Sequence, residues 1–230
     1  MATHFSNEGL KFLRGLKRNN DREWFDARKK VYETEWKAPM LAVIAAVNDA
    51  LVEFAPEHVR PPQKAMMRIY RDVRFSKDKS PYKTQVAAWW AREGLEKTSG
   101  GGYYFHVSAT EVTIAAGVYM PEREQLLAIR RYLVEHHAEL RGLLAGKKLK
   151  AKMNEFDGLR LTRPPKGFAA EEAAMDLLLC RQWGVAATLP VEVATQATLV
   201  KEIVERFRLA APVVKLLNTP LLGRPKQPLF

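Results

Sequence analysis

The chain has 230 residues, of which 47% are hydrophobic and 27% charged, and its formal net charge is +11. This balance excludes a disordered or fibrous protein, and the length is sufficient to bury a core without disulfides or structural metal. The one cysteine, Cys180, excludes an intramolecular disulfide and a cysteine-based zinc cluster.

The N-terminal segment reads as three helices. Residues 6–18 combine capping residues with leucines at helical spacing, and residues 21–39 carry a broad apolar stripe. Pro39 suits the first turn of the third helix, because proline has no N–H that the first turn would need to pair. The proline-rich residues 55–64 then predict a connection between elements.

The hydrophobic period changes in residues 66–75, MMRIYRDVRF. Apolar and polar residues alternate there, which predicts a half-buried strand with Phe75 on its apolar side and Arg71 as the exception on that side. Strands are also predicted within residues 82–93, 102–109 and 111–120, the last two joined as a hairpin.

The C-terminal half returns to helical patterns. Helices are predicted over residues 121–146, 170–183 and 191–217, with an irregular basic stretch at 147–167 that includes a short strand at 158–162. The predicted fold class is α+β, with a central mainly antiparallel sheet packed with N- and C-terminal helices. We expect a single domain over residues 1–217 and a proline-rich tail over 218–230.

Positive charge gathers in one short part of the chain. Between Arg60 and Lys83 there are eight basic residues against two aspartates, which accounts for +6 of the net charge of +11. Such an excess raises the local potential and favours an anionic partner. A solvated basic loop without a ligand is the alternative that charge alone leaves open.

The residues of this segment have the chemistry of an anion site. The guanidinium group of arginine suits phosphate or carboxylate, and a turn with small hydroxyls and exposed N–H groups also favours anions. The candidate anion-binding residues are Arg68, Arg71, Arg74, Lys77, Lys79 and Lys83. The candidate supporting residues are Asp72, Ser76, Asp78, Ser80 and Tyr82. The alternative is a structural network in which Arg–Asp pairs fasten a long loop to the sheet.

Four other polar residues are candidates to line a cleft beside this segment. Asn20 and Arg22 precede the second predicted helix, although Asn20 or Asp21 also suits the role of its cap. Tyr104 and His106 share one face of a predicted strand. His106 has the chemistry of an acid or base, and a hydrogen-bonded structural histidine is the alternative.

The segment RIYRDVRFSKDKSPYKT closely resembles the signature of domain of unknown function family 2461, a set of conserved uncharacterised proteins. FLRGLKRNNDREWFDARKKVYE, GGYYFHVSATEVTIAAGVYMP and PPKGF agree with the same family, so the resemblance covers roughly residues 5–217. One segment departs from the pattern, because AAGVYMP keeps one glycine and has Tyr119 where the family commonly has tryptophan. The resemblance implies an α+β domain that usually stands alone, and it brings no established activity and no assigned catalytic residues.

Three functions remain open from the sequence. The first is binding of a phosphate-bearing ligand or nucleic-acid backbone, the second is an enzyme acting on an anionic small molecule or phosphoester, and the third is a scaffold ordered by Arg–Asp pairs. No cofactor is identified, and we expect no metal site because lysines and arginines compete for the charge of Asp72 and Asp78. The sequence gives no oligomeric state.

Features outside the charged segment favour a cytoplasmic protein without a membrane partner. The N-terminus lacks the basic start and the continuous apolar run of a signal peptide, and the longest apolar segment, MLAVIAAV, is far shorter than a membrane helix. Cys180 follows the apolar run MDLLL, which predicts a buried thiol.

Overall fold

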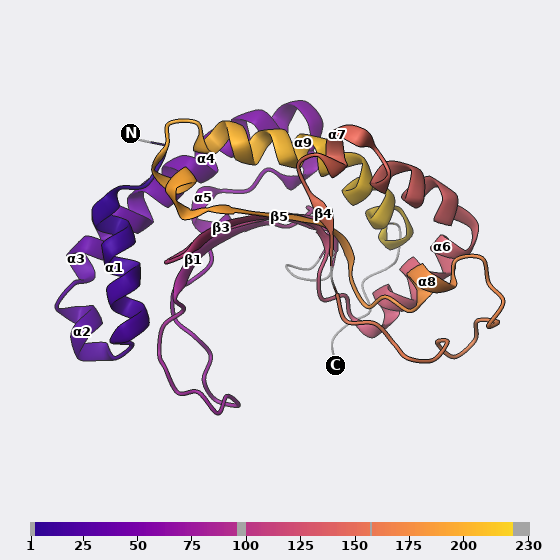
Figure 1. Ribbon diagram of the computed structural model, residues 1–230, viewed down its shortest axis with the longest axis horizontal. Helices are drawn as coiled ribbons and strands as arrows, with labels where there is room; N and C mark the ends of the chain where they lie inside the picture. The colour runs from indigo at the N-terminus through magenta and orange to yellow at the C-terminus, as the bar shows by residue number, and fades with distance from the viewer. Residues whose placement is uncertain (1–2, 96–99, 157, 223–230) are drawn as a thin grey trace. The chain divides into compact units, whose positions relative to one another are not determined.

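The protein is an α+β protein, as predicted, in a computed structural model that describes residues 3–95, 100–156 and 158–222 (Figure 1). The α-helices are α1 (Asn7–Arg18), α2 (Arg22–Asp26), α3 (Lys29–Tyr32), α4 (Ala38–Phe54), α5 (Pro62–Ala65), α6 (Arg123–Leu144), α7 (Lys147–Lys150), α8 (Met175–Leu178) and α9 (Leu199–Asn218). The strands are β1 (Gln85–Trp90), β2 (Gly102–Ser108), β3 (Glu111–Val118), β4 (Asn154–Glu155) and β5 (Trp183–Pro190). A π-helical segment, η1 (Glu33–Lys37), and three 3-10 turns, η2 (Pro56–His58), η3 (Val191–Thr195) and η4 (Thr219–Leu221), complete the described elements.

The first helix forms as its sequence predicts. The Ser6 hydroxyl caps α1 by accepting a hydrogen bond from the Gly9 N–H at 3.0 Å. The leucines at helical spacing, Leu10, Leu13 and Leu16, are all buried. The Ser6 cap therefore accounts for where α1 begins, and one amphipathic face accounts for how it packs.

The helix predicted over residues 21–39 is interrupted, so that prediction is wrong in its continuity. Asp21 caps α2 through the Trp24 N–H, but the backbone of Arg28 leaves the helical range at φ −121°, ψ 12°. The chain then resumes as α3 and passes through the π segment, in which the Ala38 N–H bonds to the Glu33 carbonyl. This wider turn lies directly before Pro39, which cannot donate a backbone hydrogen bond.

The five strands form one antiparallel sheet of order β1-β2-β3-β5-β4, which confirms the predicted sheet and the β2–β3 hairpin. The helix expected over residues 170–183 is wrong, because only the single turn of α8 forms there and Trp183 begins strand β5. The short strand expected at 158–162 is reduced to an isolated bridge between Arg160 and Cys180. The thiol of Cys180 is buried, as predicted.

The strand predicted over residues 66–75 is also wrong. This part of the chain makes only two isolated antiparallel bridges, Met66 with Ala88 and Tyr70 with Tyr82. The alternation of exposure persists without a ladder, since Ile69 is buried while Arg68 and Tyr70 are exposed. Residue Phe75, expected on the apolar side, is 94% exposed because the chain has already turned at that point.

Residue contacts divide the chain into two compact units. The first comprises Met1–Trp90, Tyr103–Ala115 and Ala187–Arg208, and aromatic side chains fill its core, where the Trp90 ring meets Phe207 edge-on at 5.4 Å between centroids. The second comprises Ala91–Gly102, Ala116–Ala186 and Leu209–Phe230. Strands β3 and β5 supply residues to both units, and the single domain expected over residues 1–217 stays a prediction.

The second unit contains the beginning of the predicted tail. Helix α9 ends at Asn218, whose buried amide accepts from the Gly101 N–H at 2.8 Å and donates to the Gly101 carbonyl at 3.1 Å. Asn218 is therefore part of the folded core and not of a surface tail. Residues 223–230 of the predicted tail lie outside the described residues. Among the helices of the described part of the chain, none has the length and apolar character to cross a membrane.

Candidate functional site

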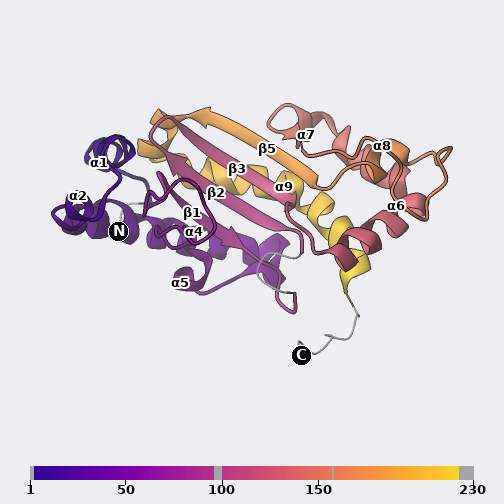
Figure 2. The same ribbon diagram turned by 90° about the horizontal axis from the view of Figure 1, so that it is seen from below.

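The charged segment forms a long projecting loop in the first unit, residues 66–84, which we name the basic hairpin. It connects α5 to β1 and extends away from the strands on the side opposite α4 (Figures 1 and 2). Its two arms are joined near the sheet by hydrogen bonds from the Lys83 N–H to the Ile69 carbonyl and from the Arg71 N–H to the Pro81 carbonyl, at 2.8 and 2.9 Å. The hairpin is therefore ordered at its base without being a regular ladder.

The loop between α1 and α2 fixes the base of the hairpin. Asn20 donates its side-chain amide to the Tyr82 carbonyl at 2.9 Å and accepts from the Tyr82 N–H at 3.1 Å. The buried Tyr82 ring stacks on the Phe25 ring, with centroids 4.0 Å apart and an interplanar angle of 15°. Tyr70 packs against the same pair and remains half exposed. Asn20 thus lies beside the charged segment, and its place in a cleft stays a prediction.

Arg71 braces the interior of the hairpin. Its guanidinium group pairs with the Asp78 carboxylate and donates to the Ser80 carbonyl at 3.2 Å and to the Ser76 hydroxyl at 3.4 Å. Hydrogen bonds from Ser80, together with this guanidinium group, lower the pKa of Asp78 to about 2. The hydrogen bonds of the Arg71 guanidinium group are therefore made within its own loop, as expected if Arg–Asp pairs order that loop.

Two further cations of the hairpin are also engaged. Arg74 grips Asp72 with two parallel hydrogen bonds of 3.0 and 2.8 Å, and these bonds hold the pKa of the Asp72 carboxyl below its ordinary value. Lys79 donates to the Val73 carbonyl at 3.0 Å. Both side chains are exposed, so they still contribute charge to the surface around the turn.

Arg68 and Lys77 differ from the other cations of the hairpin. Both are exposed, and within the described parts of the chain neither makes a hydrogen bond or an ion pair. Arg68 acts on Asp72 only through its field, where it helps to lower the pKa of that carboxyl. Lys83 is half exposed at the base of the hairpin and has an interaction within the fold. The hairpin therefore keeps positive charge that its two aspartates do not neutralise.

The tip of the hairpin presents an aromatic ring. Phe75 is 94% exposed, and the guanidinium carbon of Arg74 lies 5.7 Å from the centroid of its ring. A hydrogen bond from the Ser76 N–H to the Val73 carbonyl, 3.3 Å long, closes the turn that carries the ring. The sequence reasoning missed this feature, because the alternating pattern assigned Phe75 to the core side of a strand.

A second polar group lies on strands β1–β3, on their face opposite α4. The Tyr104 hydroxyl lies 3.1 Å from His106 Nδ1 and accepts from the Gln85 amide at 3.3 Å. His106 Nε2 lies 3.9 Å from the Glu111 carboxylate. Burial lowers the pKa of His106, and Glu111 opposes this shift in part. Tyr104 and His106 thus share a face, as predicted, and Glu111 is a neighbour that the sequence did not indicate.

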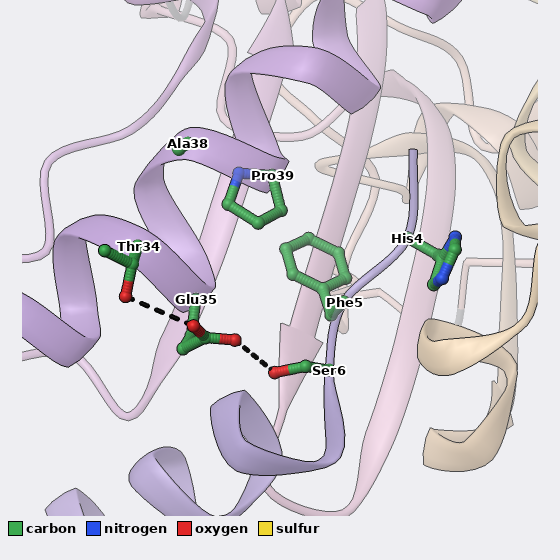
Figure 3. A pocket seen from close by; sticks show the side chains of 7 residues that line it. All are labelled: His4, Phe5, Ser6, Thr34, Glu35, Ala38 and Pro39. Carbon is green, nitrogen blue, oxygen red and sulfur yellow. Dashed lines mark hydrogen bonds between the residues drawn. The ribbon is translucent and has the colours of Figure 1, made fainter. Parts of the chain in front are cut away.

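A cavity of about 360 Å³ lies between residues 4–6, the π segment and the start of α4 (Figure 3). Its carboxylate, Glu35, accepts hydrogen bonds from the hydroxyls of Ser6 at 2.5 Å and Thr34 at 3.2 Å. These bonds, together with the capping bond to Ser6, satisfy the polar groups that face one another there. The lining residues are His4, Phe5, Ser6, Thr34, Glu35, Ala38 and Pro39, and none belongs to the basic hairpin.

The predicted residues thus fall into two groups. The hairpin contains the six candidate cations with Asp72, Ser76, Asp78, Ser80 and Tyr82, and Asn20 joins its base. Arg22 is exposed near Tyr82. Burial raises the pKa of the Tyr82 hydroxyl, and the charge of Arg22 opposes this shift. Among the described residues, no group of three or more acidic, histidine or cysteine side chains could hold a metal ion.

Comparison with known proteins identifies a family. The family model described as conserved hypothetical protein (DUF2461) matches residues 8–216 of the chain, which include the basic hairpin and the polar group on β1–β3. No curated protein and no solved structure matches the chain.

Proposed function

We propose an anion-binding function for the chain, which belongs to the DUF2461 family of conserved hypothetical proteins. The ligand is a phosphate-bearing molecule or a nucleic-acid backbone, and the basic hairpin is the surface that binds it. The observation that carries the proposal is the pair Arg68 and Lys77, which are exposed without an ion pair among the described residues. Cations of this kind raise the local potential and can meet phosphate without first breaking a bond in the fold.

The engaged cations support the same proposal in another way. Arg71 and Asp78 hold the two arms together, so the exposed cations are presented on a loop whose shape is already fixed. A preorganised surface loses less conformational entropy when a ligand binds. The Arg–Asp network that the sequence offered as a purely structural alternative therefore serves binding as well.

The proposal is tested with a probe that carries phosphates and no bases, a fluorescently labelled abasic oligodeoxynucleotide of 12 units. The variant Arg68→Ala/Lys77→Ala removes two charges from the hairpin. The control variant Lys147→Ala/Lys148→Ala removes two exposed charges from α7. We expect the hairpin variant to bind at least tenfold more weakly than the control variant.

Salt dependence gives a second readout of the same contacts. Each phosphate contact of a single strand contributes about 0.7 to the slope of log affinity against log salt, so the hairpin variant should lower the slope by about 1.4. Equal affinities and equal slopes for the two variants would reject the hairpin as the anion site.

A second candidate function rests on the polar group of β2 and β3. His106 lies between the Tyr104 hydroxyl and the Glu111 carboxylate. A proton can pass between the hydroxyl of Tyr104 and the imidazole, and such transfers are used in general acid–base catalysis. This arrangement supports an enzyme acting on an anionic small molecule or phosphoester. Hydrolysis of a p-nitrophenyl phosphoester that falls by about 100-fold or more in His106→Gln would favour it. Unchanged turnover in the variant would remove it.

A further inference from the structure

We infer that the ligand of the basic hairpin is a single-stranded nucleic acid and that Phe75 stacks on one of its bases. This inference rests on the proposed anion-binding function and names the ligand class. Phe75 is 94% exposed at the tip of the hairpin, while other aromatic residues of the first unit, such as Phe25, Trp90 and Phe105, are buried. An aromatic ring surrounded by cations is the arrangement that binds single strands, because the ring stacks on bases while the cations meet phosphates.

The environment of Phe75 leaves its ring available. The turn from Val73 to Ser76 carries the ring outward, and the guanidinium carbon of Arg74 lies 5.7 Å from the ring centroid. Arg74 is in turn held by two hydrogen bonds to Asp72. The cation therefore stays beside the ring and leaves a ring face for a ligand base.

The spread of the cations favours an extended ligand over a small phosphorylated molecule. Small ligands bind in concave pockets that enclose most of their surface. The cavity described above lies at the start of the chain and contains no residue of the hairpin. A polymer needs no such enclosure, because it can contact Arg68 on one arm of the loop, Phe75 at the tip and Lys77 just after it.

Single strands are favoured over duplexes, and nucleic acid over lipid. Bases in a duplex are already stacked and present no free face to a side chain, whereas unpaired bases do. A lipid surface would require the tip to enter the hydrocarbon, where the turn backbone and the carboxylates of Asp72 and Asp78 would be desolvated. The exposed ring of Phe75, which stands between Arg74 and Lys77, suits a partner that is itself polar.

The test compares two probes of equal length and charge, a labelled 12-residue oligothymidylate and the abasic oligodeoxynucleotide. Stacking on one base is worth roughly 5- to 150-fold in affinity, so the wild-type protein should prefer the probe with bases by that factor. Phe75→Ala should abolish the preference and leave the affinity for the abasic probe unchanged. Phe75→Trp should keep the preference, and its indole fluorescence should change when the oligothymidylate binds.

The outcomes separate this inference from the proposed function. If Arg68→Ala/Lys77→Ala weakens binding of both probes while Phe75→Ala changes neither, the hairpin binds anions and the stacking inference is wrong. If the Arg68→Ala/Lys77→Ala variant binds the abasic probe as well as the wild type does, the proposed function fails. Binding to phosphatidylserine vesicles that requires Phe75, without any preference between the two probes, would identify a lipid ligand and overturn the inference. Since Phe75 is exposed, melting temperatures should be equal across its variants.

Discussion

Asn20 and Tyr82 are 62 positions apart in the chain, and one side-chain amide satisfies both backbone groups of the tyrosine. The amide donates to the Tyr82 carbonyl at 2.9 Å and accepts from its N–H at 3.1 Å. An asparagine is suited to this role because its side chain offers a donor and an acceptor in one plane. The base of the hairpin is therefore attached to the N-terminal helices by a pair of bonds that aspartate or leucine could not make.

The first prediction concerns this attachment. Asn20→Ala should leave two backbone groups of Tyr82 without a protein partner. The folded conformation of the hairpin should then be less stable by about 1–3 kcal/mol. We expect faster tryptic cleavage within residues 68–79 and weaker binding of the abasic probe. Asn19→Ala is the matched control, because among the described residues the Asn19 side chain donates only to the Gly15 carbonyl at the end of α1. Equal cleavage rates in the two variants would contradict the prediction.

The sequence predicted the helices and strands best where one face is buried. The spacing of Leu10, Leu13 and Leu16 predicts α1, because a helix places all three on one face and that face is buried. Strand β5 was missed, since GVAATLP has small residues whose place is set by neighbouring strands and not by their own propensity.

The hairpin shows the corresponding limit for the candidate site. Its residue types indicated an anion surface, but the sequence could not show that Arg71 turns inward to Asp78 or that Phe75 turns outward. Both depend on where the chain reverses, and the charged residues of this segment are compatible with several positions of the turn.

The second prediction concerns the brace. Arg71→Ala removes a side chain that is 26% exposed and bonds to three groups of the loop. The free energy needed to open the hairpin should therefore fall by about 1–3 kcal/mol. Arg74→Ala is the control, because its pair with Asp72 is exposed to solvent and such pairs add little to stability. Hydrogen exchange of amides in the hairpin should accelerate in the first variant and stay near the wild-type rate in the second. The reverse order would show that Arg71 is not the brace.

The third prediction concerns the acid sensitivity of the hairpin. Ser80 and Arg71 hold the pKa of Asp78 at about 2, below its ordinary 3.8, so the unfolded loop binds a proton more readily than the folded one. The stabilisation by Asp78 is complete above pH 3.8 and is lost as the pH falls towards 2. Carbon NMR of the Asp78 carboxyl should titrate near 2, and the Ser80 amide should shift with it. In Asp78→Asn the shift of the Ser80 amide should disappear; a carboxyl midpoint near 3.8 would count against the bonds described.

The fourth prediction concerns His106. Burial lowers its pKa below the ordinary 6.5, so the folded protein holds the neutral imidazole and protonation favours unfolding. Its contribution to stability is full above pH 6.5 and declines as the pH falls from 6.5 towards the lower folded value. The melting temperature of wild type should therefore drop more steeply between pH 7.5 and 5 than that of His106→Gln, which has no imidazole to protonate. Parallel curves for the two proteins would show that His106 does not carry this dependence.

The fifth prediction concerns Gly117, the one glycine kept in the segment AAGVYMP. Its φ is +140°, and a Cβ at this position would lie 2.2 Å from the Trp183 carbonyl oxygen and 2.5 Å from the Gly184 Cα. Gly117→Ala must therefore strain the backbone and push strand β5 away. Each of these two effects should lower the free energy of unfolding by about 1–3 kcal/mol. The expected fall in melting temperature is on the order of 5–15 °C.

Gly142 provides the control for this substitution. It lies within α6, and nothing stands within 4 Å of the position its Cβ would take. Gly142→Ala should stabilise the helix by roughly 0.5–1 kcal/mol, because alanine loses less backbone entropy than glycine on folding. Opposite shifts of the melting temperature from the same chemical change would locate the requirement for glycine in the contact of β3 with β5. A fall of equal size in both variants would mean that the added methyl group, and not its place between the strands, causes the loss.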